Sequence, residues 1–363
     1  MIAAMNGICF TTASLKRNNR PRTLIKSMLP PCFFNGCHTP FIVARGGCLI
    51  YDFAGMRAAS SPIAIPDRLN LAIMLGQCAA IAGCILALKH TGGWMLLPLA
   101  IVFGAVMNSV YSIIHEAEHA MLFSNRRWND MAGAFMALFF PAPFHLIRQG
   151  HLGHHLRNRT DDEAFDFYFE EDHKIWKILV FYGILTGFYY LIVVLSNLVF
   201  LLLPFRDDKK YWHVDQASTA FMKSLNPFYR QIIRLECAAV IALHTGIIWL
   251  TGIPVSHYFA MYAGYGFMWS AMQYVHHYGT ERHVTRGARN LWIWGPLDLA
   301  WLNHNWHLAH HEQPSVPWIY LPQLDAAKSE KRGFLVSAYL KMWRGPRLAS
   351  ARVPNIHDEK IIP

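Results

Sequence analysis

The fold is decided by residues 94–119, WMLLPLAIVFGAVMNSVYSIIHEAEH. Residues 94–114 are mostly apolar and long enough for a helix that crosses a bilayer, and they run directly into His115 and His119. Residues four apart lie on one helix face, so both imidazoles can reach the same metal ion. The stretch predicts a metal site at a membrane surface.

Three more histidine clusters lie at or just past the end of an apolar stretch. In each, the spacing of three or four residues is again that of one helix face. The clusters are His151, His154 and His155; Gln273 with His277; and His307, His310 and His311. Neutral imidazole ligates iron, zinc and copper, and nine such rings are more than one ion needs.

The composition places these clusters in a membrane protein. Hydrophobic residues make up 53% of the 363 residues, charged residues only 15%, and mean hydropathy is positive. The formal net charge of +10 does not indicate a nucleic-acid partner, because Lys and Arg gather beside apolar segments and form no basic face interleaved with aromatics. Membrane orientation explains the excess of positive charge.

Four apolar segments come close to the roughly 20 residues of a spanning helix. They form two hairpins, because only the short turns Lys89 to Gly93 and Pro254 to Ser256 separate the members of each pair. The segments are residues 71–88, 94–114, 235–253 and 257–275. Residues 1–70 carry eight Lys or Arg against two Asp, so the positive-inside rule places the N-terminus in the cytoplasm. His115 and His277 then emerge on that side.

Two further apolar segments lie between the hairpins, and they must not add a single crossing if all the histidine clusters are to lie on one side of the membrane. Residues 178–203 are long enough to cross, but one more crossing would separate His277 from His155. We expect this segment, which Gly183 and Gly187 interrupt, to re-enter or to lie in the interface. Residues 131–144 are too short to cross and contain two prolines, so we expect a short helix pair or a dip.

The expected fold class is therefore an all-α integral membrane protein. It has four transmembrane helices in two hairpins, interfacial or re-entrant helices, and a cytoplasmic cap rich in histidine. Residues 1–70 form a basic cytoplasmic segment, residues 71–325 the membrane domain, and residues 326–363 a cytoplasmic tail.

Several chemistries compete for the histidines. His115-Glu-Ala-Glu-His119 matches the HExxH pattern of zinc proteases, with Glu116 as base, but that leaves seven imidazoles unexplained. A metal transporter or sensor is a second alternative, although transport sites usually lie near the bilayer midplane. Two iron ions with open positions use the nine rings most economically.

The clusters follow the order HxxxH, HxxHH and a late HxxHH, and the last is embedded in NWHLAHHEQPSVPW, residues 305–318, followed by Leu321-Pro322. On the strength of these motifs, the chain resembles the membrane fatty acid desaturase and hydroxylase superfamily. The resemblance extends over residues 71–325. The resemblance implies a non-haem di-iron centre. The implied ligands are His115, His119, His151, His154, His155, His277, His307, His310 and His311.

Other polar residues beside these positions are candidates for supporting roles. Acyl-CoA desaturases have Asn-x-x-x-His where this chain has Gln273 and His277, so the resemblance makes Gln273 a candidate ligand through water. His276, His304, Asp298 and Asn303 are candidates to contact the ligands from outside. Candidates to orient ring N–H groups also include Glu116, Glu118, Asp161 and Asp162.

The resemblance implies an O2-dependent oxidoreductase that attacks an unactivated C–H bond of a fatty acyl chain, first of all a fatty acid desaturase. A hydroxylase, a ketolase and a decarboxylase that forms a 1-alkene are the alternatives, and HYGTER, residues 277–282, also resembles membrane alkane monooxygenases. The acyl chain is carried as free acid, CoA ester, carrier-protein ester or lipid.

Electrons are expected from a separate ferredoxin, rubredoxin or cytochrome b5-like protein, since no flavin or nicotinamide fingerprint appears. Basic residues flank the first two clusters and are candidates to bind a substrate head group, an electron carrier or membrane lipid. They are Arg126, Arg127, Arg148, Arg157 and Arg159.

Overall fold

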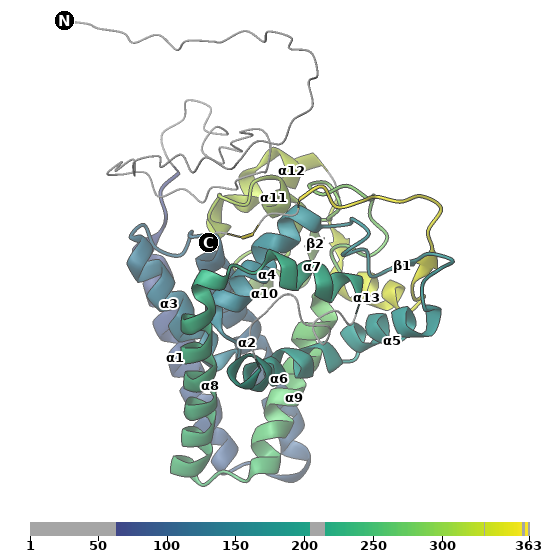
Figure 1. Cartoon of the computed structure of the whole chain (residues 1–363). Helices are drawn as coiled ribbons and strands as arrows, with labels where there is room; N and C mark the ends of the chain where they lie inside the picture. The colour runs from purple at the N-terminus through teal and green to yellow at the C-terminus, as the bar shows by residue number, and fades with distance from the viewer. Residues whose placement is uncertain (1–62, 204–214, 330, 358–359, 362–363) are drawn as a thin grey trace, which may run out of the picture. The chain divides into compact units, whose positions relative to one another are not determined.

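The computed structural model describes residues 63–203, 215–329, 331–357 and 360–361, and within these ranges it is mainly helical (Figure 1). The predicted N-terminal segment 1–70 lies outside the described residues as far as residue 62. The first hairpin consists of α1 (Asp67–Lys89) and α2 (Leu96–Glu118), joined through the short η1 (Gly93–Met95). The second consists of α8 (Arg230–Thr251), which follows η3 (Pro227–Tyr229), and α9 (Val255–Met272).

The two hairpins pack against each other through α2 and α9. Small residues allow this close approach, since a Cβ added at Gly264 would lie 2.8 Å from Ala100 Cβ. The second turn ends α8 at Gly252, whose φ of +66° is the left-handed conformation that glycine adopts freely, and Pro254 begins α9. Gly92 in the first turn lies beside His257 at the start of α9, with 3.6 Å from an added Cβ to Cε1.

Because both turns lie at the same end, the other ends of α2 and α9 also meet. His115 lies in the last turn of α2, and His277 follows the end of α9. The prediction that these two histidines emerge at the same end is confirmed.

By length and composition, three helical stretches can cross a membrane: Asp67–Lys89, Gly93–Glu118 and Pro227–Thr251. The count rises to five if each of two bent helix pairs makes one span. Large apolar side chains on these helices are exposed, among them Trp249 at 80% and Leu250 at 76%, as expected for a lipid-facing surface. The last predicted segment, residues 257–275, corresponds to α9, which packs along α2 but is not among the stretches that are long and apolar enough to cross, so the fourth predicted crossing stays a prediction.

The segment 178–203 is not a straight helix. It divides between α5 (Lys174–Leu185) and α6 (Phe188–Leu202), which meet at 92°. The bend lies at Gly187, which has a φ of +92°, and a Cβ there would come within 3.0 Å of the Phe267 backbone. A side chain would therefore be strained and crowded at this position. The bend is compatible with the predicted re-entrant or interfacial path of this segment, which stays a prediction.

A second bent pair of helices follows the first histidine cluster, and its second helix carries the second cluster. It consists of α3 (Arg126–Phe139) and α4 (Phe144–Arg157), which meet at 102°. Asn125 caps α3 by accepting hydrogen bonds from two backbone N–H groups, and Pro141 and Pro143 separate the helices. The expected short helix pair is present, and it extends beyond residues 131–144.

Short elements gather at the histidine-bearing end of the hairpins (Figure 1). The helices there are α7 (Gln216–Ser224), α10 (Gly295–Ala300), α11 (His307–Glu312), η4 (Trp318–Gln323), α12 (Asp325–Ser329) and α13 (Leu335–Met342).

The C-terminal segment is attached to this end of the molecule by two short parallel pairings. Strand β1 (Phe167–Tyr168) pairs with β4 (Arg347–Leu348), and β2 (Leu291–Trp292) pairs with β3 (Gly333–Phe334). Met342 of α13 is fully buried. Residues 331–349 therefore pack onto the domain.

Candidate metal centre

The secondary structure turns each histidine cluster toward a common centre. His115 lies in the last turn of α2 and His119 caps its C-terminus. The second cluster lies in the last two turns of α4, where His151 and His155 share one face and His154 lies beside them. The third cluster occupies α11, and His277 lies in the turn that follows α9.

The nine predicted histidines form two groups, and within each group the candidate ligand atoms lie within 4.8 Å of one another. We call them group A and group B. Group A contains His115, His119, His151, His155 and His310, and group B contains His154, His277, His307 and His311.

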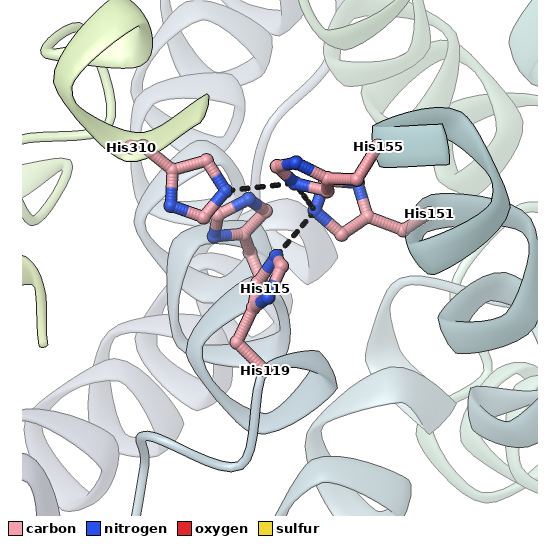
Figure 2. Close-up of side chains that lie close together, drawn as sticks. All are labelled: His115, His119, His151, His155 and His310. Atoms are coloured by element: carbon pink, nitrogen blue, oxygen red, sulfur yellow. Dashed lines mark hydrogen bonds between the residues drawn. The ribbon is translucent and has the colours of Figure 1, made fainter. Parts of the chain in front are cut away.

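Figure 2 shows the rings of group A converging from α2, α4 and α11. His119 Nε2 lies 2.8 Å from His151 Nε2, and His155 Nε2 lies 3.0 Å from His310 Nε2. In group B, His277 Nε2 lies 3.0 Å from His307 Nε2. The ring nitrogens thus point at one another in both groups, as the ligands of a shared ion do.

Group A and group B are adjacent. The ring centroids of His155 in group A and His311 in group B are 4.4 Å apart, and His154 and His155 are consecutive residues of α4. Two ions, one in each group, would therefore be neighbours.

The chemistry of the donors fits metal ions. Among the described residues, His115 Nε2 and both ring nitrogens of His311 are buried without a hydrogen-bond partner, which is costly unless something else binds them. Burial, and then the neighbouring imidazoles, hold the pKa values of His310 and His311 well below the usual range. The rings therefore stay neutral, which is the form that ligates metal. All-imidazole sites with five and four donors suit iron, zinc, copper or nickel.

Two rings of group B, those of His154 and His277, are oriented from outside. His154 Nδ1 lies 2.7 Å from Glu163 Oε2, and Arg157 Nε donates to the other carboxylate oxygen at 2.9 Å. Burial raises the pKa of Glu163, but Arg157 and His154 outweigh it and lower the pKa to about 2. The carboxylate stays ionised and holds the His154 ring with Nε2 free to bind a metal. His277 Nδ1 donates to the backbone oxygen of Gly287 at 2.8 Å.

Glu163 is a functional candidate that sequence reasoning missed. Asp161 and Asp162 were the predicted carboxylates of this run, but they contact other groups. Asp161 pairs with Arg282, and Asp162 accepts from Gln216 Nε2 at 2.8 Å. The sequence did offer a signal for Glu163, because it is the third of three consecutive acidic residues that follow helix α4.

The remaining predicted neighbours lie around the groups without belonging to them. His276 Nε2 lies 3.2 Å from Asn305 Oδ1, and Asn305 in turn donates to Asp298 at 2.6 Å. The ring of His304 lies 4.7 Å from that of His115, and burial lowers the pKa of His304 to about 4. Asn303 donates to Trp318 O.

The polar residues of α2 and α9 also face protein groups. Gln273 donates to the backbone oxygen of Trp269 at 3.2 Å. Glu116 accepts from the backbone N–H of Trp318 at 3.0 Å. Glu118 is buried, and within the described ranges neither of its carboxylate oxygens has a hydrogen-bond partner.

The predicted head-group arginines make ion pairs inside the protein. Arg148 pairs with Asp130 at 3.0 Å, Arg157 pairs with Glu163, and the fully buried Arg159 pairs with Asp166. These contacts favour structural roles for the three side chains. Arg126 also pairs with Asp130, at 3.2 Å, and Arg127 is exposed.

The comparisons with known proteins agree with this arrangement. A family model described as fatty acid desaturase matches residues 92–344, which include all nine histidines. The sphingolipid delta(4)-desaturase DES1 of Rattus norvegicus is 24% identical over 233 residues, which are 63% of this chain. The match spans 64% of that relative, slightly less than two thirds of its length. Because the family model covers most of the chain, including both groups of histidines, the chain belongs to the fatty acid desaturase family.

Proposed function

We propose that this chain is a membrane-bound, O2-dependent di-iron oxidase that desaturates a fatty acyl chain. The observation that carries the proposal is the pair of adjacent imidazole groups, with His155 of group A against His311 of group B. Nine imidazoles, each buried or half-buried, at the end of apolar helices suit two redox metal ions beside a lipid.

A pair of irons, when bound, supplies the activation of O2 that an unactivated methylene group requires. Overall, one O2, two electrons and two protons convert a CH2–CH2 unit into CH=CH and two waters. The protein's own contribution is to hold the ligands and to exclude water. Glu163 fixes the His154 ring, the Gly287 carbonyl fixes the His277 ring, and the partial burial of both groups limits the access of solvent.

Aromatic side chains lie beside His304, whose ring adjoins that of His115 in group A. The Tyr111 ring lies 5.9 Å from His304 and 5.5 Å from Trp269, and Phe140 lies 5.0 Å from Trp269. These rings belong to the core between the hairpins, so an acyl chain that enters from the bilayer would meet an apolar surface. We propose that electrons come from a separate small redox protein, a ferredoxin, rubredoxin or cytochrome b5-like carrier, at the histidine-bearing end.

The test is expression of the full chain with iron and a reducing system, followed by mass spectrometry of lipids and volatile hydrocarbons. The informative variant is His151→Ala, which removes a ligand from group A. The matched control is His90→Ala, because His90 is an exposed histidine just after α1, at the opposite end of the hairpin from His115.

A new double bond made by wild type and His90→Ala, and absent with His151→Ala, supports desaturation. A hydroxy acid would instead assign hydroxylation, which the same metal pair can perform, and a shortened 1-alkene would assign decarboxylation. Iron at two ions per chain with unchanged lipids would contradict an oxidase, and metal uptake by cells would then favour transport.

A further inference from the structure

A pocket outside group A and group B opens between the turn after α9, helix α11 and helix α13. Its volume is about 640 Å³. Asn290 and Leu308 form part of its wall, and Phe334 and Ser337 contribute from the C-terminal segment. Asn290 Oδ1 also accepts from the backbone N–H of Leu308 at 3.0 Å. The pocket thus adjoins the start of α11, which carries His307.

The lining of the pocket carries an excess of positive charge. Four cationic side chains and two carboxylates face it, which gives a net charge of +2. Arg286 and Glu281 neutralise each other in an exposed ion pair of 3.1 Å. Lys331 and Lys341 are exposed, and neither pairs with a carboxylate among the described residues. Their two ammonium groups are therefore available to an anion.

Helix α13 places an exposed apolar face beside these cations. Val336, Leu340 and Trp343 follow the spacing i, i+4, i+7 and are 41%, 62% and 46% exposed. Ser337 and Lys341, each one residue further along, line the pocket. One helix thus presents an unburied apolar stripe and a basic pocket side by side.

The same helix packs against the apolar helices of the domain. Tyr339 OH donates to Leu185 O at the bend between α5 and α6, and its ring lies 6.5 Å from that of Phe267 on α9. Phe267 is itself 48% exposed. The exposed stripe of α13 is therefore next to exposed apolar side chains of α9, an arrangement that suits an amphipathic helix in a membrane interface.

We propose that this pocket binds the phosphate of an anionic membrane lipid while the apolar stripe of α13 lies in the interface. Ammonium groups that have no carboxylate partner among the described residues attract a phosphate, and the stripe beside them suits the acyl chains of the same molecule. A soluble phosphate ligand would leave the stripe exposed to water. The inference concerns lipid binding and is independent of the reaction proposed at group A and group B.

Lipid retention by the detergent-solubilised full chain tests this proposal. Native mass spectrometry would compare short-chain phosphatidylglycerol with phosphatidylcholine of the same chain length. The informative variant is Lys331→Gln with Lys341→Gln, which keeps the side-chain stems. The matched control is Lys89→Gln with Lys223→Gln, because these two lysines are also exposed and lie outside the pocket.

Wild type and control should prefer phosphatidylglycerol, and the pocket variant should bind it roughly thirty-fold more weakly, since each cation near the phosphate contributes a few-fold to binding. Leu340→Ser should weaken phosphatidylglycerol further without creating a preference for phosphatidylcholine. An unchanged thermal midpoint would show that the variants fold.

Three results would overturn the proposal. The first is equal phosphatidylglycerol binding by wild type and pocket variant. The second is displacement of the lipid by millimolar inorganic phosphate or ADP, which would make the pocket a site for soluble phosphates. The third is unchanged lipid binding with slower reduction by an acidic ferredoxin, which would assign this face to a redox protein.

Discussion

Group A and group B use the same side chain but are held in different ways. Four of the five rings of group A come from the ends of α2 and α4. Within the described part of the chain, no outer hydrogen bond orients the His119 or His151 ring. In group B, His154 is anchored by Glu163 and the loop residue His277 by Gly287 O.

Backbone rigidity accounts for the external partner of His277, which lies in a turn, but not for that of His154, which lies on helix α4. A helix fixes the direction of its side chains through its own hydrogen bonds, so neighbouring turns already place His115 and His119 on one face. A turn does not fix direction in this way, and a ring on it needs an external partner. We therefore expect group B to depend on residues that never touch metal, and group A to depend mainly on the packing of α2 and α4.

The largest effect is expected where the two groups meet. His155→Ala removes a ring that lies 3.2 Å from His151, 3.0 Å from His310 and against His311 of group B. Activity should fall by more than about 100-fold, because loss of a ligand exceeds the cost of losing its outer partner. Iron analysis should give less than one iron per chain. His244→Ala is the control, since His244 is largely buried in α8 and belongs to neither group.

Asp166→Asn tests the support of the loop that carries His277. Asp166 is buried, pairs with Arg159 and accepts from Tyr274 OH at 2.7 Å and Gly279 N at 2.8 Å. A neutral amide leaves the Arg159 charge buried without its counter-ion, which costs about 3–5 kcal/mol. The thermal midpoint should drop, and iron should be lost first from group B.

Glu281→Gln is the matched control for this variant, because Glu281 makes an exposed pair with Arg286 worth less than about 1 kcal/mol. Equal midpoints for the two variants would show that the buried cluster does not hold the loop.

Glu163→Gln isolates the outer hydrogen bond of group B. The amide keeps the shape of the side chain but removes the charge that orients the His154 ring. Iron affinity and activity should fall by about 10- to 100-fold. Asp162→Asn, one residue earlier and bonded to Gln216, should leave both nearly unchanged. A comparable loss in the two variants would remove Glu163 from the site.

Arg148→Met applies the same test to group A and should have the smallest effect. Arg148 Nε donates to the backbone oxygen of Glu118 at 3.0 Å, beside His119, and Asp130 would keep its pair with Arg126. Because α2 and α4 already fix their rings, iron content should fall less than after Glu163→Gln. If this variant loses as much iron as Glu163→Gln, the two groups do not differ in the way described.

Much of the fold could be predicted because the signals are local. Apolar length identified helices α1, α2 and α8. The chain bends at Gly187, which is one of the residues that interrupt the apolar run 178–203. The conformation of the loop before α11 was not predictable. Leu302 and Asn303 both have left-handed backbones, with φ of 49° and 53°, which neighbouring packing must impose on residues other than glycine. The pairing of β3 and β4 with distant segments was missed for the same reason.

The sequence by itself determined which nine side chains are candidate ligands, because helical spacing is a local property and each cluster lies at or just past the end of an apolar run. Only the tertiary structure decided that they divide into five and four, that His154 joins group B while its neighbour His155 joins group A, and that Glu163 rather than Asp161 or Asp162 holds a ring. The reason is physical: partition depends on the angles at which α2, α4 and α11 cross, and those angles are set by contacts between residues far apart in the chain.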